Sequence, residues 1–242
     1  MVDTLLVHEI YLSIQGESTF AGLPCVFVRL TGCDLRCSYC DSAYAFTGGQ
    51  SMTVDEVVGE LEKQCDFTGA SGEKLPLVEI TGGEPLLQKN VHSLMRRLCD
   101  RGLTVLVETS GAHDISASDP RVRHVMDWKC PSSGESNKML IANIAGLKST
   151  DEVKFVIGTT EDYDWAKAQL AEHRLEERCP VLFSWVAPLE PHQRHELLKL
   201  VPTGHTPIMR RQLVERITRD KLCVRFQLQM HKFIWPPDEK GV

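Results

Sequence analysis

The sequence lacks any apolar run long enough to cross a membrane, and residues 1–6 lack the basic segment and long apolar core of a secretory signal. It also lacks an excess of basic charge, because 27 Lys and Arg residues stand against 33 Asp and Glu residues. The resulting net charge of -6 gives no overall attraction to nucleic acid or to an anionic membrane. We therefore expect a cytoplasmic protein with neither as a partner.

The cysteine pattern lacks the features of a disulfide framework. The nine cysteines are odd in number, the chain is not small, and no export signal is present. We therefore expect reduced thiols, and we expect the six cysteines that stand alone in the sequence to be small buried apolar residues. These six are Cys25, Cys65, Cys99, Cys130, Cys179 and Cys223.

No repeat, low-complexity tract or linker divides the chain, so we expect a single domain over residues 1–242. Runs typical of strands alternate with segments typical of helices. This alternation predicts an α/β fold with a mostly parallel sheet, open or curled into a partial (β/α)6-type barrel. Strands are predicted at residues 8–14, 25–30, 77–81, 103–108, 122–129, 153–157, 181–186 and 223–230, and helices at 54–65, 90–101, 163–177, 191–201 and 207–220.

Local signals mark the ends of two predicted helices. Thr53 and Glu56 have the spacing of a capping box, so they mark the start of the first helix. Gly102 follows the second helix at the position of a C′ glycine. An apolar stripe gives the first helix a buried face, formed by Val54, Val57, Val58 and Leu61.

Three cysteines fall within eight residues, directly after the strand at residues 25–30. Cys33, Cys37 and Cys40 are separated by three and then two residues, and Gly32 precedes the first of them. Three thiolates leave one corner of a four-iron cubane or of a tetrahedral zinc without a nearby cysteine. No histidine stands at zinc-finger spacing, and a disulfide-exchange pair would leave Cys33 unexplained. A metal centre with one open ligand position is therefore the favoured interpretation.

Two further features flank this loop. A Gly-Gly-Glu-Pro run, residues 82–85, follows the strand at 77–81, and parallel α/β folds gather their chemistry at such strand ends. Strand alternation places Arg29 on the same face as Phe27 and Cys25, close to the cysteine loop. That arginine can bind a carboxylate or, in the simpler interpretation, pair with a surface acid.

The spacing of Cys33, Cys37 and Cys40, with Tyr39 before the last cysteine, resembles the cluster loop of the radical S-adenosylmethionine (SAM) superfamily. The resemblance implies that the three cysteines hold a [4Fe-4S] cluster and that SAM occupies the fourth iron. The run at residues 82–85 resembles the second signature of that superfamily, in which glycine carbonyls approach the methionine amino group of SAM. The expected domain is then a single radical SAM domain.

Four segments narrow the resemblance to the 7-carboxy-7-deazaguanine synthases, namely residues 13–17, 27–33, 108–111 and 227–232. The resemblance implies a carbon-nitrogen lyase that converts 6-carboxy-5,6,7,8-tetrahydropterin to 7-carboxy-7-deazaguanine, with loss of ammonia, in 7-deazapurine (queuosine) biosynthesis. It also implies bound Mg²⁺, a reductase or flavodoxin-type electron donor and a homodimer. The cluster and SAM carry the difficult chemistry, so no side chain is assigned as a general base.

The same resemblance assigns the site residues. Asp127 and Trp128 stand where the family pattern has Ser and Pro, so backbone contacts carry over to them more safely than side-chain contacts. The use of the chain end near the substrate is not carried over to residues 236–242. The metal ligands are Cys33, Cys37 and Cys40 for the cluster and Ser42 for Mg²⁺. The cofactor-binding residues are Tyr39, Gly83, Glu84, Ser110, Asp127, Trp128 and Lys129. The substrate-binding residues are Ile14, Gln15, Gly16, Arg29, Thr81 and His231, the last expected at a strand end.

Two alternatives remain at this stage. The first is a different small radical SAM enzyme, an activase that makes a glycyl radical on a protein partner, although Gln15 and Arg29 argue against it. The second is a zinc-stabilised interaction module without catalysis. Metal content after anaerobic reconstitution separates the second from the enzyme.

Overall fold

The computed structural model describes residues 3–64, 77–236 and 239–242. Within these residues a nine-stranded sheet has the order β3-β1-β2-β4-β5-β6-β7-β8-β9. Strands β2 and β4 to β9 are parallel, whereas β1 runs antiparallel to both β2 and β3. The open, mostly parallel sheet confirms the predicted partial barrel. The strands are β1 Thr4–Ile14, β2 Pro24–Leu30, β3 Gln50–Thr53, β4 Leu77–Gly82, β5 Thr104–Thr109, β6 Arg123–Asp127, β7 Glu152–Ile157, β8 Val181–Trp185 and β9 Arg225–Gln227.

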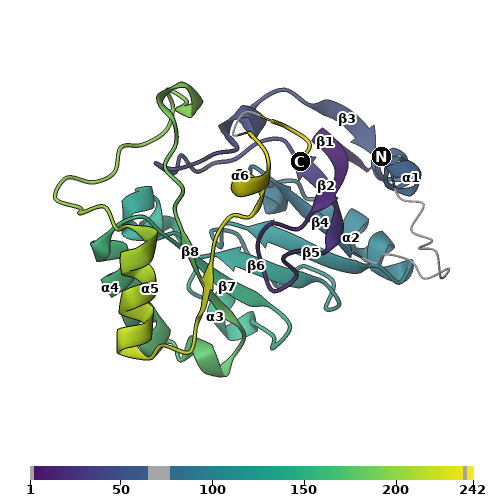
Figure 1. Ribbon diagram of the computed structural model, residues 1–242. Coiled ribbons are helices and arrows are strands. Elements are labelled where there is room, and N and C mark those ends of the chain that lie inside the picture. The colour runs from purple at the N-terminus through teal and green to yellow at the C-terminus, as the bar shows by residue number, and fades with distance from the viewer. Residues whose placement is uncertain (1–2, 65–76, 237–238) are drawn as a thin grey trace.

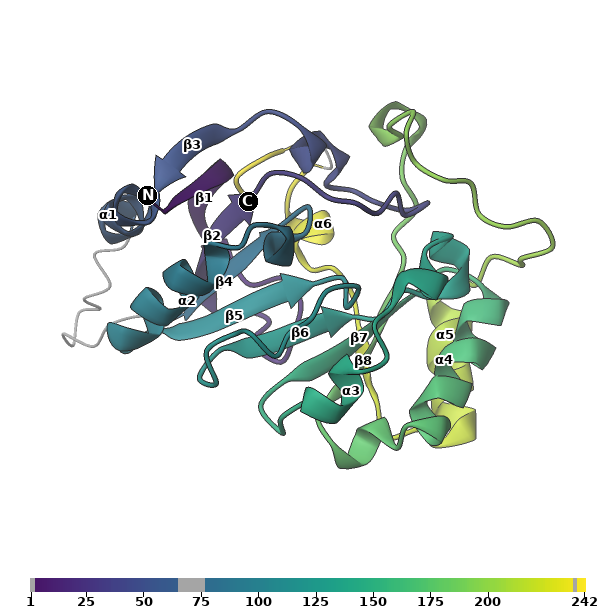
Figure 2. The same ribbon diagram turned by 180° about the vertical axis from the view of Figure 1, so that it is seen from behind.

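Helices cover one face of the sheet, and the end of the chain crosses the other (Figures 1 and 2). Helices α2, α3 and α4 lie on the face seen in Figure 2, whereas α6 lies on the face seen in Figure 1. No helix of the described residues is long and apolar enough to span a membrane. The α-helices are α1 Val54–Gln64, α2 Val91–Asp100, α3 Asn143–Gly146, α4 Thr160–Glu172, α5 Arg210–Asp220 and α6 His231–Ile234.

The main core lies between the sheet and the helices that cover it. Val26, Val28 and Leu30 of β2 point into this core, whereas Cys25 and Phe27 belong to a cluster on the opposite face, as strand alternation predicts. The predicted stripe of α1 is buried here in full, at Val54, Val57, Val58 and Leu61. The capping box is also confirmed, because the Glu56 amide donates to the Thr53 hydroxyl over 3.1 Å and the Thr53 amide donates to the Glu56 carboxylate over 2.7 Å.

The predicted helix at residues 191–201 is wrong. A single 3-10 turn, Pro191–Gln193, is followed by irregular chain. The Lys199 amide donates to the Arg36 carbonyl in the cysteine loop over 2.9 Å, whereas in a helix it would donate to a carbonyl of the same helix. Leu198 is buried against that loop while Leu200 is 76% exposed. Tertiary contact with the loop therefore decides the conformation of this segment.

The predicted last strand is also too long. β9 ends at Gln227, and His231 begins α6 instead of ending a strand. The chain leaves the sheet because the Met230 amide donates to the Gly16 carbonyl over 3.0 Å, in the turn after β1. Two smaller corrections accompany this one. The polar strand β3 was not expected because it carries no apolar run, and α5 begins at Arg210, three residues later than predicted.

The thiols outside the cysteine loop follow the prediction with one exception. Cys25, Cys99, Cys130 and Cys179 are buried, and none of them forms a disulfide with another described cysteine. Cys223 is free but exposed, because it lies in the short connection between α5 and β9. The thiol at position 65 lies outside the described residues.

Candidate active site

A cavity of about 1020 Å³ opens at the carboxyl ends of the parallel strands. Segments from both ends of the described chain line it, from Tyr11 to Val242. It brings together fifteen of the seventeen residues that the sequence assigns to the site. These are Ile14, Gln15, Gly16, Arg29, Cys33, Cys37, Tyr39, Cys40, Ser42, Thr81, Gly83, Ser110, Asp127, Lys129 and His231.

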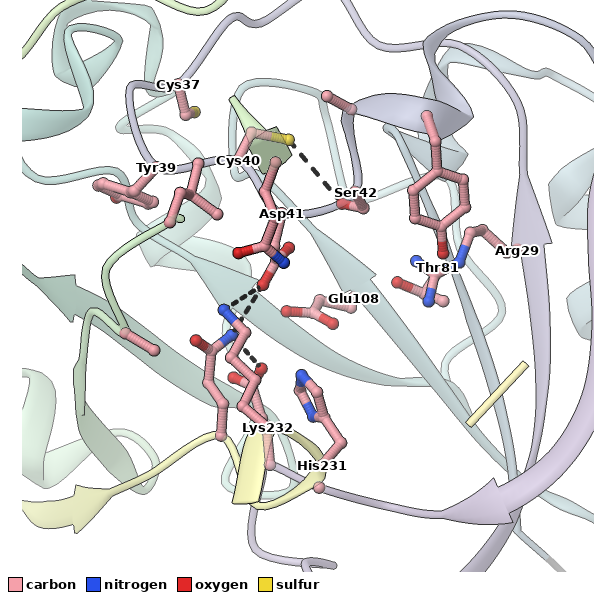
Figure 3. Close-up of a pocket in the computed structure, with 18 of the residues that line it drawn as sticks. Arg29, Cys37, Tyr39, Cys40, Asp41, Ser42, Thr81, Glu108, His231 and Lys232 are labelled. Atoms are coloured by element: carbon pink, nitrogen blue, oxygen red, sulfur yellow. Dashed lines mark hydrogen bonds and ion pairs between the residues drawn. The ribbon is translucent and has the colours of Figure 1, made fainter. Parts of the chain in front are cut away.

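Cys37 and Cys40 of the loop lie at one end of this cavity (Figure 3), and Cys33 lines it too. Burial raises the pKa of the Cys33 thiol to about 11 and that of Cys37 to about 12, so these thiols ionise when metal binds and not before. Among the described residues no three His, Cys, Asp or Glu side chains converge closely enough for a single metal ion. Three thiols can each bind a different iron of a cubane.

Of the two glycines at the end of β4, Gly82 packs against Leu30 of β2 and Gly83 against the start of the cysteine loop. A Cβ atom on Gly83 would lie 2.8 Å from the Cβ of Cys33, so only glycine allows this approach. The next amide, that of Glu84, donates to the Gly32 carbonyl over 2.8 Å. The strand end is therefore fixed beside the thiols, where a cofactor on the cluster would reach its backbone.

Glu84 and Trp128 are the two assigned residues that do not line the cavity. The Glu84 carboxylate is fully buried and accepts from the Leu86 amide, the Thr109 hydroxyl and both the amide and hydroxyl of Ser110, over 2.6 to 3.0 Å. It therefore ties the end of β4 to the end of β5. Trp128 packs in the core, with its ring 5.6 Å from that of Phe155. Its amide donates to the Lys154 carbonyl over 2.8 Å, so neither its side chain nor its amide is available for the expected contact.

Ser42 and Asp41 lie beside the end of the cavity that the three cysteines line. The Ser42 hydroxyl is 3.9 Å from the Cys40 sulfur and faces the cavity. Its neighbour Asp41 forms an ion pair with Lys232 over 2.6 Å (Figure 3). Burial would raise the pKa of Asp41, but Lys232 lowers it below its ordinary value. Carboxylate and hydroxyl oxygens are suitable ligands for Mg²⁺, although sequence reasoning had selected only Ser42.

The turn after β1 is held from several directions. The Gln15 side-chain amide donates to Glu79, while its carbonyl accepts from the Glu17 amide over 2.8 Å. A Cβ atom on Gly16 would lie 2.6 Å from Nδ1 of His231, so this turn and the start of α6 are in close contact. The predicted substrate residues at the two ends of the chain therefore meet at one wall of the cavity.

Arg29 has the acidic partner of the simpler interpretation and also lines the cavity, so its binding of a substrate carboxylate stays a prediction. Its Nε pairs with the Glu9 carboxylate over 2.7 Å, and a terminal nitrogen donates to the Tyr11 hydroxyl over 2.9 Å. The guanidinium also lines the cavity, next to Thr81 in Figure 3. It is therefore a fixed positive charge available to a carboxylate of a bound molecule.

Sequence reasoning missed a buried charge network beneath this turn. The Lys154 ammonium is 3% exposed, contacts Glu108, lies 2.8 Å from Glu17 and lies 3.9 Å from Asp127. Burial would raise the pKa of Glu17, but Lys154 lowers it to about 2. The sequence offered one signal that further acidic groups line this cavity. Strand alternation places Glu79 on the same face of β4 as Thr81, which was predicted to bind substrate.

Two irregular segments cover the opening. Leu189 and Leu198, from the connection between β8 and α5, pack with Cys33, Cys40 and Phe46. Residues near the end of the chain, Pro236 and Glu239 to Val242, also line the cavity, although the sequence left their role open. There the Lys240 ammonium lies 4.5 Å from the centre of the Tyr44 ring.

Comparison with known proteins agrees with this geometry. A model of the radical SAM superfamily matches residues 27–119. The 7-carboxy-7-deazaguanine synthase of Koribacter versatilis is 42% identical over 98% of this chain and 99% of the relative. That of Chlorobaculum tepidum is also 42% identical, over 98% and 97%. The chain belongs to the 7-carboxy-7-deazaguanine synthase family.

Two solved structures have the same fold as this chain. QueE from Escherichia coli superposes with a TM-score of 0.68, at 18% identity and over 94% of this chain and 95% of that chain. Streptococcus suis SuiB bound to S-adenosylmethionine superposes with a TM-score of 0.53, at 16% identity and over 82% of this chain and 48% of that chain. At these identities the likeness concerns the fold alone.

The cavity fits the groups that radical SAM enzymes of this synthase family use, a [4Fe-4S] cluster and SAM. Three thiols and the two-glycine strand end meet at one end of the cavity. The Tyr39 hydroxyl there is buried and has no hydrogen-bond partner among the described residues, so a polar group of a bound molecule can satisfy it.

Proposed function

We propose that this chain converts 6-carboxy-5,6,7,8-tetrahydropterin to 7-carboxy-7-deazaguanine, with loss of ammonia, in 7-deazapurine (queuosine) biosynthesis. One observation carries the proposal beyond family membership. The cysteine loop, the two-glycine strand end and the turn at Gln15 line one cavity together with Arg29, although they are separated in sequence. A cofactor held by the first two would therefore face a substrate held by the last two.

Some residues of the cavity would hold the cofactors, and others would hold the substrate. Bound and reduced, the cluster and SAM supply the electron and the carbon radical that start the ring contraction. Cys33, Cys37 and Cys40 would hold the cluster, and Ser42 would hold Mg²⁺ against the substrate carboxylate. The buried Glu84 fixes the strand end that faces SAM, and it acts through hydrogen bonds without touching the cofactor.

Substrate orientation comes from charges and amides that are already fixed by the protein. Arg29 is anchored by Glu9 and supplies a positive charge, while the turn at Gly16 is held against His231. Leu189 and Leu198 exclude water from the cluster end. Because these groups are positioned before any ligand binds, little reorganisation accompanies the reaction.

Anaerobic turnover tests the proposal. Enzyme reconstituted with iron and sulfide, reduced and supplied with SAM and the tetrahydropterin, with and without Mg²⁺, is expected to release 7-carboxy-7-deazaguanine, detected by mass spectrometry. Cleavage of SAM without that product contradicts the proposal and favours the activase alternative. A colourless protein that retains zinc and no iron favours the interaction module.

We also propose an electron donor, an oligomeric state, a location and a domain content for the enzyme. A flavodoxin-type protein or a reductase supplies the electron, the enzyme is a homodimer in the cytoplasm, and residues 1–242 form one radical SAM domain. The single continuous sheet from β3 to β9 supports the one-domain part. Light scattering of the loaded enzyme, with a mass of one chain as the contradicting result, tests the dimer.

A further inference from the structure

Glu79 is a buried carboxyl group of the cavity to which no role has been assigned above. It lies on β4, two residues before Thr81 and on the same face, and it is 4% exposed. Its Oε2 accepts a hydrogen bond from the Gln15 side-chain amide. A carboxyl group in this position must either carry a buried negative charge or be neutral.

The surrounding charges favour the neutral form. Glu17 and Glu108 both pair with the single ammonium of Lys154, and Asp127 lies within 3.9 Å of the same group. Lys129 compensates Asp127 over 2.6 Å. An ionised Glu79 would add a further negative charge to a cluster whose two lysines are already matched by three carboxylates.

The electrostatics agree with this charge balance. Burial and the neighbouring Glu108 raise the pKa of Glu79 well above its ordinary value, while Lys154 and the Gln15 amide oppose the shift. Glu17 shows the opposite behaviour in the same network, since its direct contact with Lys154 lowers its pKa to about 2. Glu17 and Glu79 line the same cavity, but Glu17 contacts Lys154 directly and Glu79 does not. This difference favours the ionised form of Glu17 and the neutral form of Glu79.

A neutral carboxyl group offers the cavity a donor as well as an acceptor. The carboxylate form only accepts hydrogen bonds, whereas the acid has one hydroxyl donor beside a carbonyl acceptor. Because Oε2 accepts from Gln15, a proton on Oε1 would give this cavity wall a hydrogen-bond donor for a bound molecule. An acid edge of this kind complements a lactam, in which a ring N–H stands next to a carbonyl oxygen.

We propose that Glu79 acts as a neutral carboxylic acid that fixes the Gln15 amide and reads the lactam edge of the pterin ring, which makes it a specificity-determining residue of this site. The inference rests on the proposed function for the identity of the ligand. The neutral state of Glu79, its hydrogen bond to Gln15 and its place in the cavity wall are independent of that identity.

Three variants of the loaded enzyme test the role, with pterin affinity measured by anaerobic calorimetry. An amide has the same donor and acceptor as a neutral acid, so Glu79→Gln is expected to bind the pterin within about threefold of wild type. Glu79→Leu removes both groups and leaves Gln15 unpaired, so a loss of about tenfold or more is expected. Glu108→Gln is the matched control, because it removes a charge that Lys154 needs, and it is expected to weaken binding where Glu79→Gln does not.

The contradicting results are distinct from one another. Wild-type affinity in Glu79→Leu means that Glu79 takes no part in recognition. An equal loss in Glu79→Gln and Glu79→Leu means that the residue works as a carboxylate. Either result overturns the inference.

Thermal unfolding gives a readout that does not depend on turnover. A raised folded-state pKa means that Glu79 stabilises the fold fully below its unfolded value, and that this contribution is lost as pH rises toward the folded value. Glu79→Gln does not titrate, so its melting temperature relative to wild type is expected to rise between about pH 5 and about pH 8. A difference that stays constant or falls over this range contradicts the neutral state.

Failure of the inference can be told apart from failure of the proposed function. If the wild type makes no deazaguanine and binds no pterin, the proposed function fails, and the unfolding series still decides the charge state of Glu79. If the wild type turns over and Glu79→Leu matches it in KM and kcat, the proposed function stands and this inference alone fails.

Discussion

At the scale of single residues, charge partners decide the chemistry of this cavity more than residue type does. Glu17, Glu79 and Glu84 are all buried or nearly buried glutamates, yet they have three different surroundings. Glu17 faces a lysine, Glu79 faces an amide, and Glu84 accepts only from neutral amides and hydroxyls. None of these partners is adjacent in sequence, so the sequence predicts a carboxyl group but not its state.

Lys154 is expected to be essential for the stability of this network. Lys154→Met leaves the partly buried Glu17 and Glu108 without their buried cation, which costs up to about 3–5 kcal/mol at neutral pH. The folded-state pKa of Glu17 is lowered to about 2, so the pairing stabilises above its unfolded value and is lost as pH falls toward about 2. Urea unfolding at about pH 7 and about pH 4 is expected to show a smaller difference at the lower pH.

A surface pair supplies the control for that measurement. Lys167 contacts Asp220 over 2.6 Å, but its side chain is 46% exposed. Lys167→Met is expected to cost at most about 1 kcal/mol. A cost for Lys154→Met as small as that of the control would mean that the buried network contributes no net stability.

At the scale of elements, the sequence predicts the strand ends well, but it predicts poorly the irregular segments that cover the opening of the cavity. Periodicity identifies β2, β4 and β5 because each must bury alternate apolar residues, and the motifs directly after them then fall at one edge of the sheet. The connection between β8 and α5 has no such constraint. A helix was predicted there, but the cysteine loop supplies the contacts that decide its path, and these contacts join residues about 150 positions apart in sequence.

The link between β4 and β5 through Glu84 is open to a direct test. Glu84→Gln replaces one accepting oxygen with a donor that faces the amides and hydroxyls it now binds, so about 1–3 kcal/mol of stability is expected to be lost. SAM affinity, measured by anaerobic calorimetry, is expected to fall with it because the two glycines before Glu84 lose their anchor. Unchanged SAM binding in a destabilised variant would restrict Glu84 to stability alone.

The cover over the cysteine loop makes a separate prediction. Leu198 is 7% exposed against the loop, whereas Leu200 is 76% exposed. Leu198→Ser is expected to admit water and oxygen, so the visible absorbance of the reconstituted cluster should bleach severalfold faster in air. Leu200→Ser is the matched control and is expected to bleach at the wild-type rate. Equal rates for both variants would show that this segment does not shield the cluster.

At the scale of the whole molecule, the two ends of the chain complete the site. The turn after β1 and the segment before α6 lie on the face of the sheet opposite the covering helices (Figure 1). Sequence comparison with a family assigns residues in both segments, but their contact is a tertiary feature that no local pattern predicts. The polar cavity wall exists only because Gly16 lets these segments approach.

Gly16→Ala is expected to separate the two ends without unfolding the protein. The added methyl group would lie 2.6 Å from Nδ1 and 3.2 Å from the backbone nitrogen of His231, so the start of α6 must shift. A lost or misplaced hydrogen bond to a bound ligand costs about 1–3 kcal/mol, so pterin affinity should fall by about tenfold, while iron content and SAM affinity are retained. Gly59→Ala in α1 is the control, because its methyl group meets nothing within 4 Å and should stabilise the helix by about 0.5–1 kcal/mol. Wild-type pterin binding in Gly16→Ala would show that the contact between the turn and His231 does not shape the substrate wall.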